Sequence, residues 1–130
     1  MKVDDYLITY SLPRPFFGLN IPIPMQSAFM RDYAKKNHLI FQLPAVEICF
    51  KDSHYVLLSL LQKSRGSSLI NLCMSSVLMM PILNSDLFEK IIQESGNVIW
   101  HFPLESMILE KSELLNWVSD FKCMQSLRNQ

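Results

Sequence analysis

The segment that most constrains the fold is a short apolar run near the middle of the chain, SLINLCM at residues 68–74. Its length suits a β-strand, and its nearly unbroken apolar character is typical of a central parallel strand that is covered on both faces. A strand of this kind needs neighbouring strands beside it and helices above and below it. The sequence on either side must therefore supply both.

Strand-like and helix-like segments alternate four times along the chain. The predicted strands are residues 5–11, 38–43, 68–74 and 97–102. Helices are predicted from Pro24 to about Asn37, from a cap at Ser53 to near Gly66, from Asn84 or Ser85 to Gly96, and from about Ser112 to Leu127. This pattern predicts one α/β domain over residues 1–130. We expect three layers, with a four-stranded, mainly parallel sheet between helices on both faces, of flavodoxin-like or resolvase-like type.

Composition narrows the class of protein. Hydrophobic residues make up 49% of the 130 residues and charged residues 18%, which excludes a disordered chain. Twelve basic and twelve acidic residues cancel, so nothing in the charge favours binding to nucleic acid. The apolar surplus suits an oligomer interface, because such interfaces resemble a protein core.

The chain carries no pattern of a secreted, membrane-inserted or metal-binding protein. Acidic residues at positions 4 and 5 stand where a signal peptide would need apolar ones, and the greasiest segment, residues 69–83, is interrupted by Asn71 and Pro81. The cysteines are three and widely spaced, which favours neither disulfides nor a metal site: Cys49, Cys73 and Cys123. The three glycines are not clustered, so no phosphate-binding loop and no cofactor are predicted. We expect a cytoplasmic protein.

Polar side chains gather after each predicted strand, where ligands bind in open α/β sheets. These residues are Arg14, Asn20, Gln26, Glu47, Ser75, Ser76, His101 and Glu105. Because the carboxyl ends of parallel strands lie at one edge of the sheet, we expect these side chains to converge there.

The loop after the first strand is stiffened by Pro15, Pro22 and Pro24, which suits a preformed binding site. Arg14 either clamps an anionic group of a ligand or pins the loop through a buried carboxylate such as that of Glu47 or Glu105. Gln26 either binds a ligand hydroxyl or ties down loop carbonyls.

Candidates for chemistry are His101, Glu47 and Glu105. His101 with either glutamate could move a proton, and the two glutamates could also work as a pair in glycoside hydrolysis. The alternatives are a satisfied core histidine and carboxylates that stabilise helix N-termini. Ser76 either lines the pocket or caps the next segment. Arg31 either contacts a ligand or forms a structural ion pair.

Four stretches together resemble the sporadic carbohydrate cluster protein family. They are RPFFGLNIPIPMQSAFMRDYA from residue 14, LPAVE from 43, SSVLMMP from 75 and HFPLES from 101. The resemblance covers roughly residues 6 to 106. Family members are small bacterial proteins encoded among glycosyltransferases and sugar-nucleotide enzymes, with a tyrosine where this chain has Ser75.

The resemblance implies a role in bacterial surface-polysaccharide biosynthesis of O-antigen or capsule type. The chain would bind or modify a sugar or sugar nucleotide, or alternatively act as a non-catalytic partner or regulator of a glycosyltransferase or export complex. A homo-oligomer also fits. The order of strands and helices resembles the catalytic domain of serine recombinases as well. Those enzymes need a serine just after the first strand, where this chain has Pro15, Phe16 and Phe17, which argues against recombinase chemistry.

Overall fold

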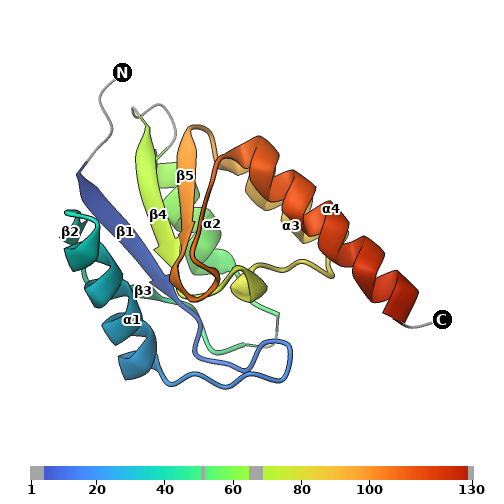
Figure 1. Cartoon of the computed structure of the whole chain (residues 1–130), viewed down its shortest axis with the longest axis horizontal. Helices are drawn as coiled ribbons and strands as arrows, with labels where there is room; N and C mark the ends of the chain where they lie inside the picture. Colours follow the sequence, from blue (N-terminus) through green and yellow to red (C-terminus); the bar gives the residue numbers. More distant parts are fainter. Residues whose placement is uncertain (1–4, 51, 65–68, 129–130) are drawn as a thin grey trace.

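A computed structural model describes residues 5–50, 52–64 and 69–128 (Figure 1). The strands are β1 (Tyr6–Ser11), β2 (Ile40–Phe41), β3 (Ala45–Val46), β4 (Ile70–Met74), β5 (Val98–Phe102) and β6 (Met107–Leu109). The α-helices are α1 (Ile23–Lys36), α2 (Tyr55–Ser64), α3 (Ser85–Glu94) and α4 (Lys111–Arg128), and the short 3₁₀ helices are η1 (Val77–Met79) and η2 (Pro103–Glu105). The predicted end of the second helix near Gly66 and the predicted strand start at Ser68 lie outside the described residues.

The strands form one mostly parallel sheet in the order β2-β1-β4-β5-β6, and β3 also pairs with β1. β1, β2, β3, β4 and β5 run parallel, whereas β6 is antiparallel to β5. The prediction of an α/β fold with a mainly parallel sheet is therefore confirmed. The prediction of four strands is wrong, because the described residues form six.

Two local features account for the extra strands. Within the predicted strand 38–43 only β2 forms, and β3 follows beyond its predicted end. Between the two strands, the carbonyl of Gln42 accepts a hydrogen bond from the side chain of Thr9 at 2.7 Å. Pro44, the residue before β3, has no N–H to offer the sheet. At the other edge, η2 and Ser106, whose φ is 54°, reverse the chain so that β6 pairs back onto β5. A strand of three residues is too short to show a pattern.

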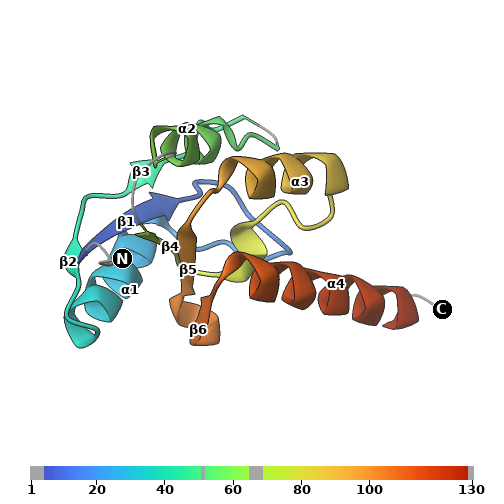
Figure 2. The same ribbon diagram turned by 90° about the horizontal axis from the view of Figure 1, so that it is seen from above.

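Helices cover both faces of the sheet, as Figure 2 shows. α1 lies alone on one face, where Met30 and Ala34 pack against Leu7 and Cys73. α2, α3 and α4 cover the other face with a larger core, which includes Leu57, Leu61, Phe88, Ile91, Leu114 and Val118 against Tyr10, Leu72 and Trp100. The spacing of three or four residues between the buried positions of each helix is the amphipathic pattern expected of a helix on a sheet.

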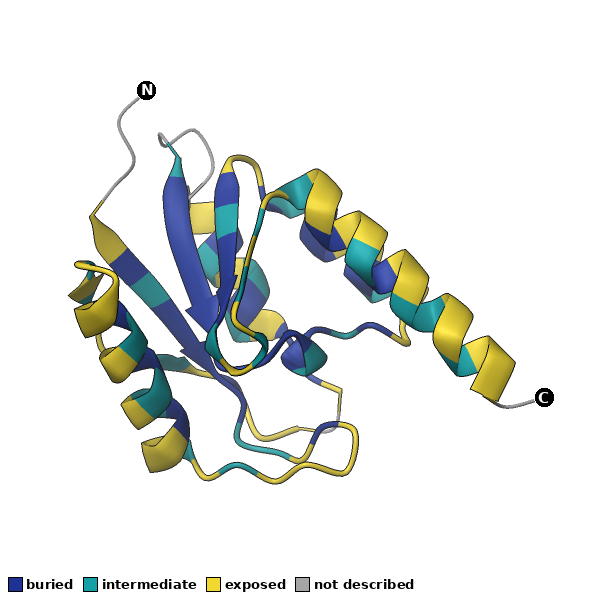
Figure 3. Ribbon diagram, viewed as in Figure 1, coloured by how far each residue is buried: buried dark blue, intermediate teal, exposed yellow. Residues whose placement is uncertain are grey.

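β4 is buried at every residue (Figure 3), as expected for a central strand. The chain leaves β1 towards β2 and β3 on one side of the sheet and returns to β4 and β5 on the other. The carboxyl ends of β1 and β4 are thus the place where connections diverge, which is where open α/β sheets bind ligands. Among the described residues, no helix is long and apolar enough to cross a membrane.

Candidate functional site

The connection from β1 to α1 is tied together by the side chain of Gln26, which is fully buried. Its Oε1 accepts a hydrogen bond from the N–H of Leu12 at 3.0 Å, and its Nε2 donates to the carbonyl oxygens of Leu12 and Ile21, both at 2.7 Å. One amide group thereby joins both ends of the loop. The predicted contact from Gln26 to a ligand hydroxyl has no accessible atom to act through.

The tip of this loop is a tight turn in which the backbones of Phe16 and Leu19 bond each other at 2.9 and 2.8 Å. Phe17 and Gly18 both have positive φ, at 49° and 76°. A side chain at Gly18 would meet open space, so the backbone angle and not crowding calls for glycine there. The ring of Phe17 packs edge-on against Phe121 of α4, with 5.6 Å between centroids, which holds the tip against that helix.

Arg14 follows β1 in the same loop and is partly exposed. Its guanidinium donates to the carbonyl oxygen of Phe50 at 3.2 Å and lies 3.4 Å from Nδ1 of His54. A guanidinium has five N–H groups, so three have no partner among the described residues. Arg14 also forms no ion pair with any described carboxylate, and the predicted partners Glu47 and Glu105 are engaged elsewhere. The cation is therefore positioned by neutral acceptors and keeps donors for an anion.

His54 is the buried partner of Arg14, just before α2. Its Nε2 lies 3.2 Å from the carbonyl oxygen of Met79, which can only accept, so Nε2 carries the proton and Nδ1 presents its lone pair to Arg14. Burial is the largest effect and lowers the pKa of His54. The hydrogen bond with Met79 opposes it, the charge of Arg14 lowers the pKa again, and Glu47 raises it slightly, so that the pKa stays below its ordinary value. The imidazole is therefore neutral at neutral pH and serves as an acceptor that orients the guanidinium.

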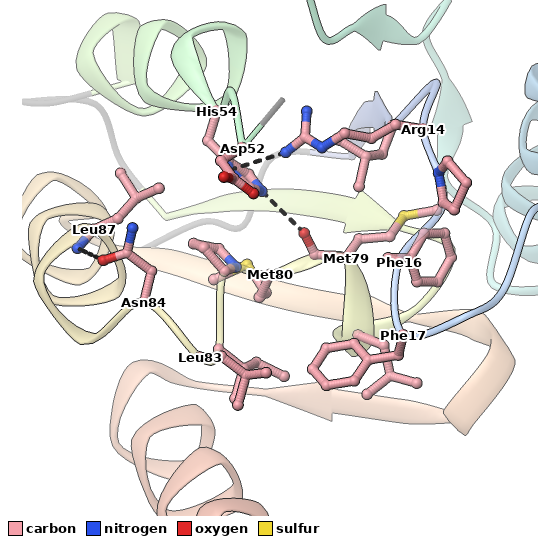
Figure 4. A pocket seen from close by; sticks show the side chains of 15 residues that line it. Arg14, Phe16, Phe17, Asp52, His54, Met79, Met80, Leu83, Asn84 and Leu87 are labelled. Carbon is pink, nitrogen blue, oxygen red and sulfur yellow. Dashed lines mark hydrogen bonds between the residues drawn. The ribbon is translucent and has the colours of Figure 1, made fainter. Parts of the chain in front are cut away.

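Arg14 and His54 stand on the rim of a cleft of about 370 Å³ (Figure 4). We call this space the Arg14 cleft. Its lining comprises Leu12, Arg14, Pro15, Phe16, Phe17, Asp52, His54, Leu78, Met79, Met80, Pro81, Ile82, Leu83, Asn84 and Leu87. The polar groups Arg14, Asp52 and His54 lie along one side, whereas Phe17 and Leu83 lie along the other. The cleft thus offers charge and hydrogen bonds to one side of a ligand and apolar surface to the other.

A second hollow of about 660 Å³ adjoins this cleft between the starts of α2 and α3. We call it the α2–α3 hollow. It shares Asp52, His54, Asn84 and Leu87 with the Arg14 cleft and is completed by Phe50, Ser53, Tyr55, Leu58, Asp86 and Lys90. Because these shared residues line both, the two spaces meet along one boundary.

Glu47 is buried beneath α2 and accepts hydrogen bonds from every side. Tyr10 and Ser53 donate through their hydroxyls at 2.8 and 3.0 Å, and the backbone N–H groups of Val56 and Leu57 donate at 3.1 and 3.4 Å. Burial raises the pKa of Glu47, but these hydrogen bonds outweigh it and hold the pKa below its ordinary value. The carboxylate therefore satisfies the N-terminus of α2, and as a proton acceptor it is weak.

Glu105 and Ser76 form a similar device at the start of η1. One oxygen of Glu105 accepts from the hydroxyl of Ser76 and the other from the N–H of Val77, both at 2.7 Å. The hydroxyl oxygen of Ser76 in turn accepts from the N–H of Leu78 at 3.1 Å. Ser76 is almost fully buried and caps η1, and neither residue lines the Arg14 cleft.

His101 lies on the opposite face of the sheet from the Arg14 cleft. Its neighbours along β5, Trp100 and Phe102, belong to the core under α2, α3 and α4, whereas His101 bonds Tyr33 of α1 through Nδ1. Its Nε2 donates to Oδ1 of Asn71 at 2.8 Å. Burial lowers the pKa of His101 to about 4. The structure therefore does not bring His101 together with either glutamate, and the proton transfer predicted for them has no shared site.

Arg31 lies on the exposed side of α1 with its guanidinium carbon 5.1 Å from the centre of the Phe41 ring, a cation–π contact. Among the described residues it forms no ion pair, whereas its neighbour Asp32 pairs with Lys36 at 2.9 Å. Arg31 does not line the Arg14 cleft either. Of the four residues predicted to bind substrate, the structure thus places only Arg14 at the cleft.

The sequence-based prediction missed His54, Asp52 and Asn84. His54 and Asp52 follow the edge strand β3 and precede α2, and Asn84 precedes α3. All three stand in loops before helices, so the rule that selected Arg14 also covers them. Asn84 was expected only as a possible first residue of the helix. It caps α3, since its Oδ1 accepts from the N–H of Leu87 at 3.2 Å, while its Nδ2 has no partner among the described residues.

No protein-family model matches the chain, and neither a curated protein nor a solved structure matches it. The resemblance to the sporadic carbohydrate cluster family therefore stays a prediction. Within the described residues, no three His, Cys, Asp or Glu side chains are grouped so that they could hold a metal ion.

Proposed function

We propose that the protein binds a sugar or sugar nucleotide in the Arg14 cleft, as a component of bacterial surface-polysaccharide biosynthesis. One observation carries the proposal. The guanidinium of Arg14 stands on the rim of the cleft, held by Phe50 and His54, with three N–H groups and its charge unmatched by any described carboxylate. Such a group is suited to a phosphate or carboxylate.

The remaining lining suits a sugar attached to that anion. Asp52 is exposed and supplies oxygens that accept from hydroxyls, while Nδ2 of Asn84 is a donor without a partner among the described residues. The apolar side of the cleft, with Phe17 and Leu83, matches the C–H face of a sugar ring. Few polar groups placed among apolar ones are the usual make-up of small-ligand sites.

The strand order supports the location of the proposed ligand site, and the cysteines support a cytoplasmic location of the protein. The order β2-β1-β4-β5 of the parallel strands supports a flavodoxin-like arrangement as part of the proposal. In such a fold the ligand site lies where the connections diverge, as the Arg14 cleft does at β1 and β4. The cysteines are all free: Cys49, Cys73 and Cys123. Free thiols suit a reducing compartment, and on this basis we assign the protein to the cytoplasm. The proposal concerns binding and assigns no reaction.

Substitution of Arg14 tests the proposed function. We expect sugar phosphates or sugar nucleotides to raise the melting temperature of the wild-type protein by several degrees at saturating concentration, and Arg14→Ala to abolish the shift. A ligand at 100 times its Kd stabilises by about 2.7 kcal/mol. Arg31→Ala is the matched control, since it removes an arginine that does not line the cleft. The proposal would be refuted by equal shifts in wild type and Arg14→Ala, or by the absence of a shift with every sugar phosphate and sugar nucleotide tested.

A second candidate function is self-association, which is favoured by the edge of the sheet formed by β2 and β3. Exposed apolar side chains follow one another there: Tyr6, Ile40, Leu43, Val46 and Ile48, with Leu43 84% exposed. Residues 39–50 contain one charge, Glu47, which is buried. Because residues 39–50 carry no exposed charge, this segment can pack against the same segment of a second copy of the chain, which favours that copy as its occupant. Since β2 and β3 have two residues each, side-chain packing and not strand addition would join the copies.

Leu43→Lys tests this interface. We expect the wild type to sediment as a dimer at tens of micromolar and the variant as a monomer, because two copies would place like charges together. Met124→Lys, which changes a similarly exposed residue at the far end of α4, is expected to leave the dimer intact. If the wild-type protein is monomeric throughout this concentration range, the proposed interface between copies is refuted.

A further inference from the structure

Two exposed aromatic rings border the α2–α3 hollow. Phe50 and Tyr55 are each 68% exposed, although both line this hollow beside the Arg14 cleft. Large aromatic side chains at the mouth of a hollow form a surface on which flat rings stack, and the stacking of a nucleobase on an aromatic side chain strengthens binding by roughly tenfold or more, with little preference among bases.

Both rings are attached to backbone that the fold holds in place. The carbonyl oxygen of Phe50 accepts from Arg14 at 3.2 Å and from the N–H of Ser53 at 3.1 Å, and its N–H donates to the carbonyl of Ile48 at 2.8 Å. Tyr55 is the first residue of α2, whose following N–H groups are bound by Glu47. A ring that stacks here therefore has to immobilise little more than the side chains of Phe50 and Tyr55, because their backbone is already fixed.

The hollow is also at the right place for one ligand to use both spaces. Arg14, which would hold an anion, is hydrogen-bonded to the backbone of Phe50, and His54 lines both the cleft and the hollow. A phosphate at Arg14 and a ring at Phe50 or Tyr55 would thus be neighbours, as the phosphate and the base of one nucleotide are.

The charges around the hollow limit the kind of nucleotide. Arg14 and Lys90 supply two positive charges, and Asp52 and Asp86 supply two negative ones. Carboxylates accept hydrogen bonds from the hydroxyls of a ribose, as an acidic residue does in dinucleotide-binding sites. Because these lining charges cancel, they favour a diphosphate over the more highly charged triphosphate.

From these contacts we infer that the ligand is a nucleoside diphosphate sugar, which spans both spaces. Its base lies against Phe50 and Tyr55 in the α2–α3 hollow, its ribose hydroxyls face Asp52 or Asp86, and its phosphates bind Arg14. The sugar occupies the Arg14 cleft towards Phe17. This inference rests on the proposed function and narrows its ligand, a sugar or sugar nucleotide, to a nucleoside diphosphate sugar.

The test compares ligands that share phosphates but differ in the base. Uridine diphosphate, adenosine diphosphate and inorganic pyrophosphate are titrated by calorimetry into wild type and into the double variant Phe50→Ala, Tyr55→Ala. We expect both nucleotides to bind wild type at least tenfold more tightly than pyrophosphate. In the double variant that advantage falls below about threefold, while pyrophosphate affinity is unchanged. Leu127→Ala, which removes an equally exposed apolar side chain near the end of α4, away from both spaces, is the control and keeps the advantage.

The outcomes separate the inference from the proposed function. Equal affinities of nucleotides and pyrophosphate, or a nucleotide advantage that survives the double variant, would overturn the inference. The proposed function would still stand if sugar phosphates bind in a way that depends on Arg14. Because Phe50 and Tyr55 are exposed, the double variant is expected to keep the wild-type melting temperature within a few degrees, which circular dichroism checks.

Discussion

Glu47→Ala is expected to lower the free energy of unfolding by roughly 4 kcal/mol. The carboxylate accepts hydrogen bonds from the hydroxyls of Tyr10 and Ser53 and from backbone N–H groups that include those of Val56 and Leu57. Each buried donor left without a partner costs about 1–3 kcal/mol, and part of that cost is recovered where water enters. Urea denaturation followed by tryptophan fluorescence measures the loss, since Trp100 is fully buried in the core.

Glu89→Ala is the matched control, because Glu89 is an exposed glutamate of α3. Its loss is expected to change stability by less than about 0.5 kcal/mol. A loss of less than about 1 kcal/mol in Glu47→Ala would contradict the view that this side chain holds the start of α2.

The pH dependence of stability separates the contribution of the negative charge of Glu47 from the contribution of its shape. Its pKa is held below the ordinary value of 4.5, so the folded protein binds the proton less readily than the unfolded chain does. The stabilisation is therefore fully present above pH 4.5 and is lost as the pH falls through the lower folded pKa. Glu47→Gln keeps the shape without the titration. We expect its stability to fall less than that of wild type below pH 4.5, and parallel curves would contradict this.

Much of the architecture is predictable from local pattern, because amphipathic spacing and the apolar run of β4 are consequences of burial. All four α-helices begin within two residues of their predicted starts. The exceptions are β2, β3 and β6, which have two or three residues each. Strands so short carry no periodicity, and contacts with β1 or β5 decide where they form.

The candidate site was predictable only as far as the edge of the sheet. Arg14 and His101 both follow or end parallel strands at the same edge, as expected, yet they lie on opposite faces. Successive residues of a strand point to opposite faces of the sheet. One step along β5 therefore moves a side chain from the core face, where Trp100 lies, to the face that α1 covers. The rule for strand ends selects an edge and does not choose a face.

A second limit on predicting the site from the sequence came from polar residues near that edge that serve the fold itself. Gln26 and Glu47 have the chemistry of ligand-binding groups, but each meets its hydrogen-bonding capacity inside the protein. A sequence shows which groups can bond and does not show which partners the fold supplies. Arg14 differs from them because most of its donors stay unused among the described residues. The unused donors and not the residue type mark it as the candidate.

Gln26→Leu is expected to lower the free energy of unfolding by about 3 kcal/mol, although leucine has a similar size. The substitution leaves the N–H and carbonyl of Leu12 and the carbonyl of Ile21 without their partner, and Gln26 is fully buried, so water cannot easily replace it. The loop that carries Arg14 would also lose its tie to α1. We therefore expect a ligand of the Arg14 cleft to bind at least several-fold more weakly, measured by calorimetry on the fully folded variant.

Gln93→Leu is the control for this change, since Gln93 is an exposed glutamine of α3 and its loss should move stability by less than about 0.5 kcal/mol. Two results together would show that Gln26 organises the Arg14 loop: a lowered unfolding midpoint and a weakened ligand affinity at temperatures where the variant is still folded. If stability fell while affinity stayed at the wild-type value, the loop would keep its shape without the amide. Its prolines and the contact of Phe17 with Phe121 would then be sufficient to position Arg14.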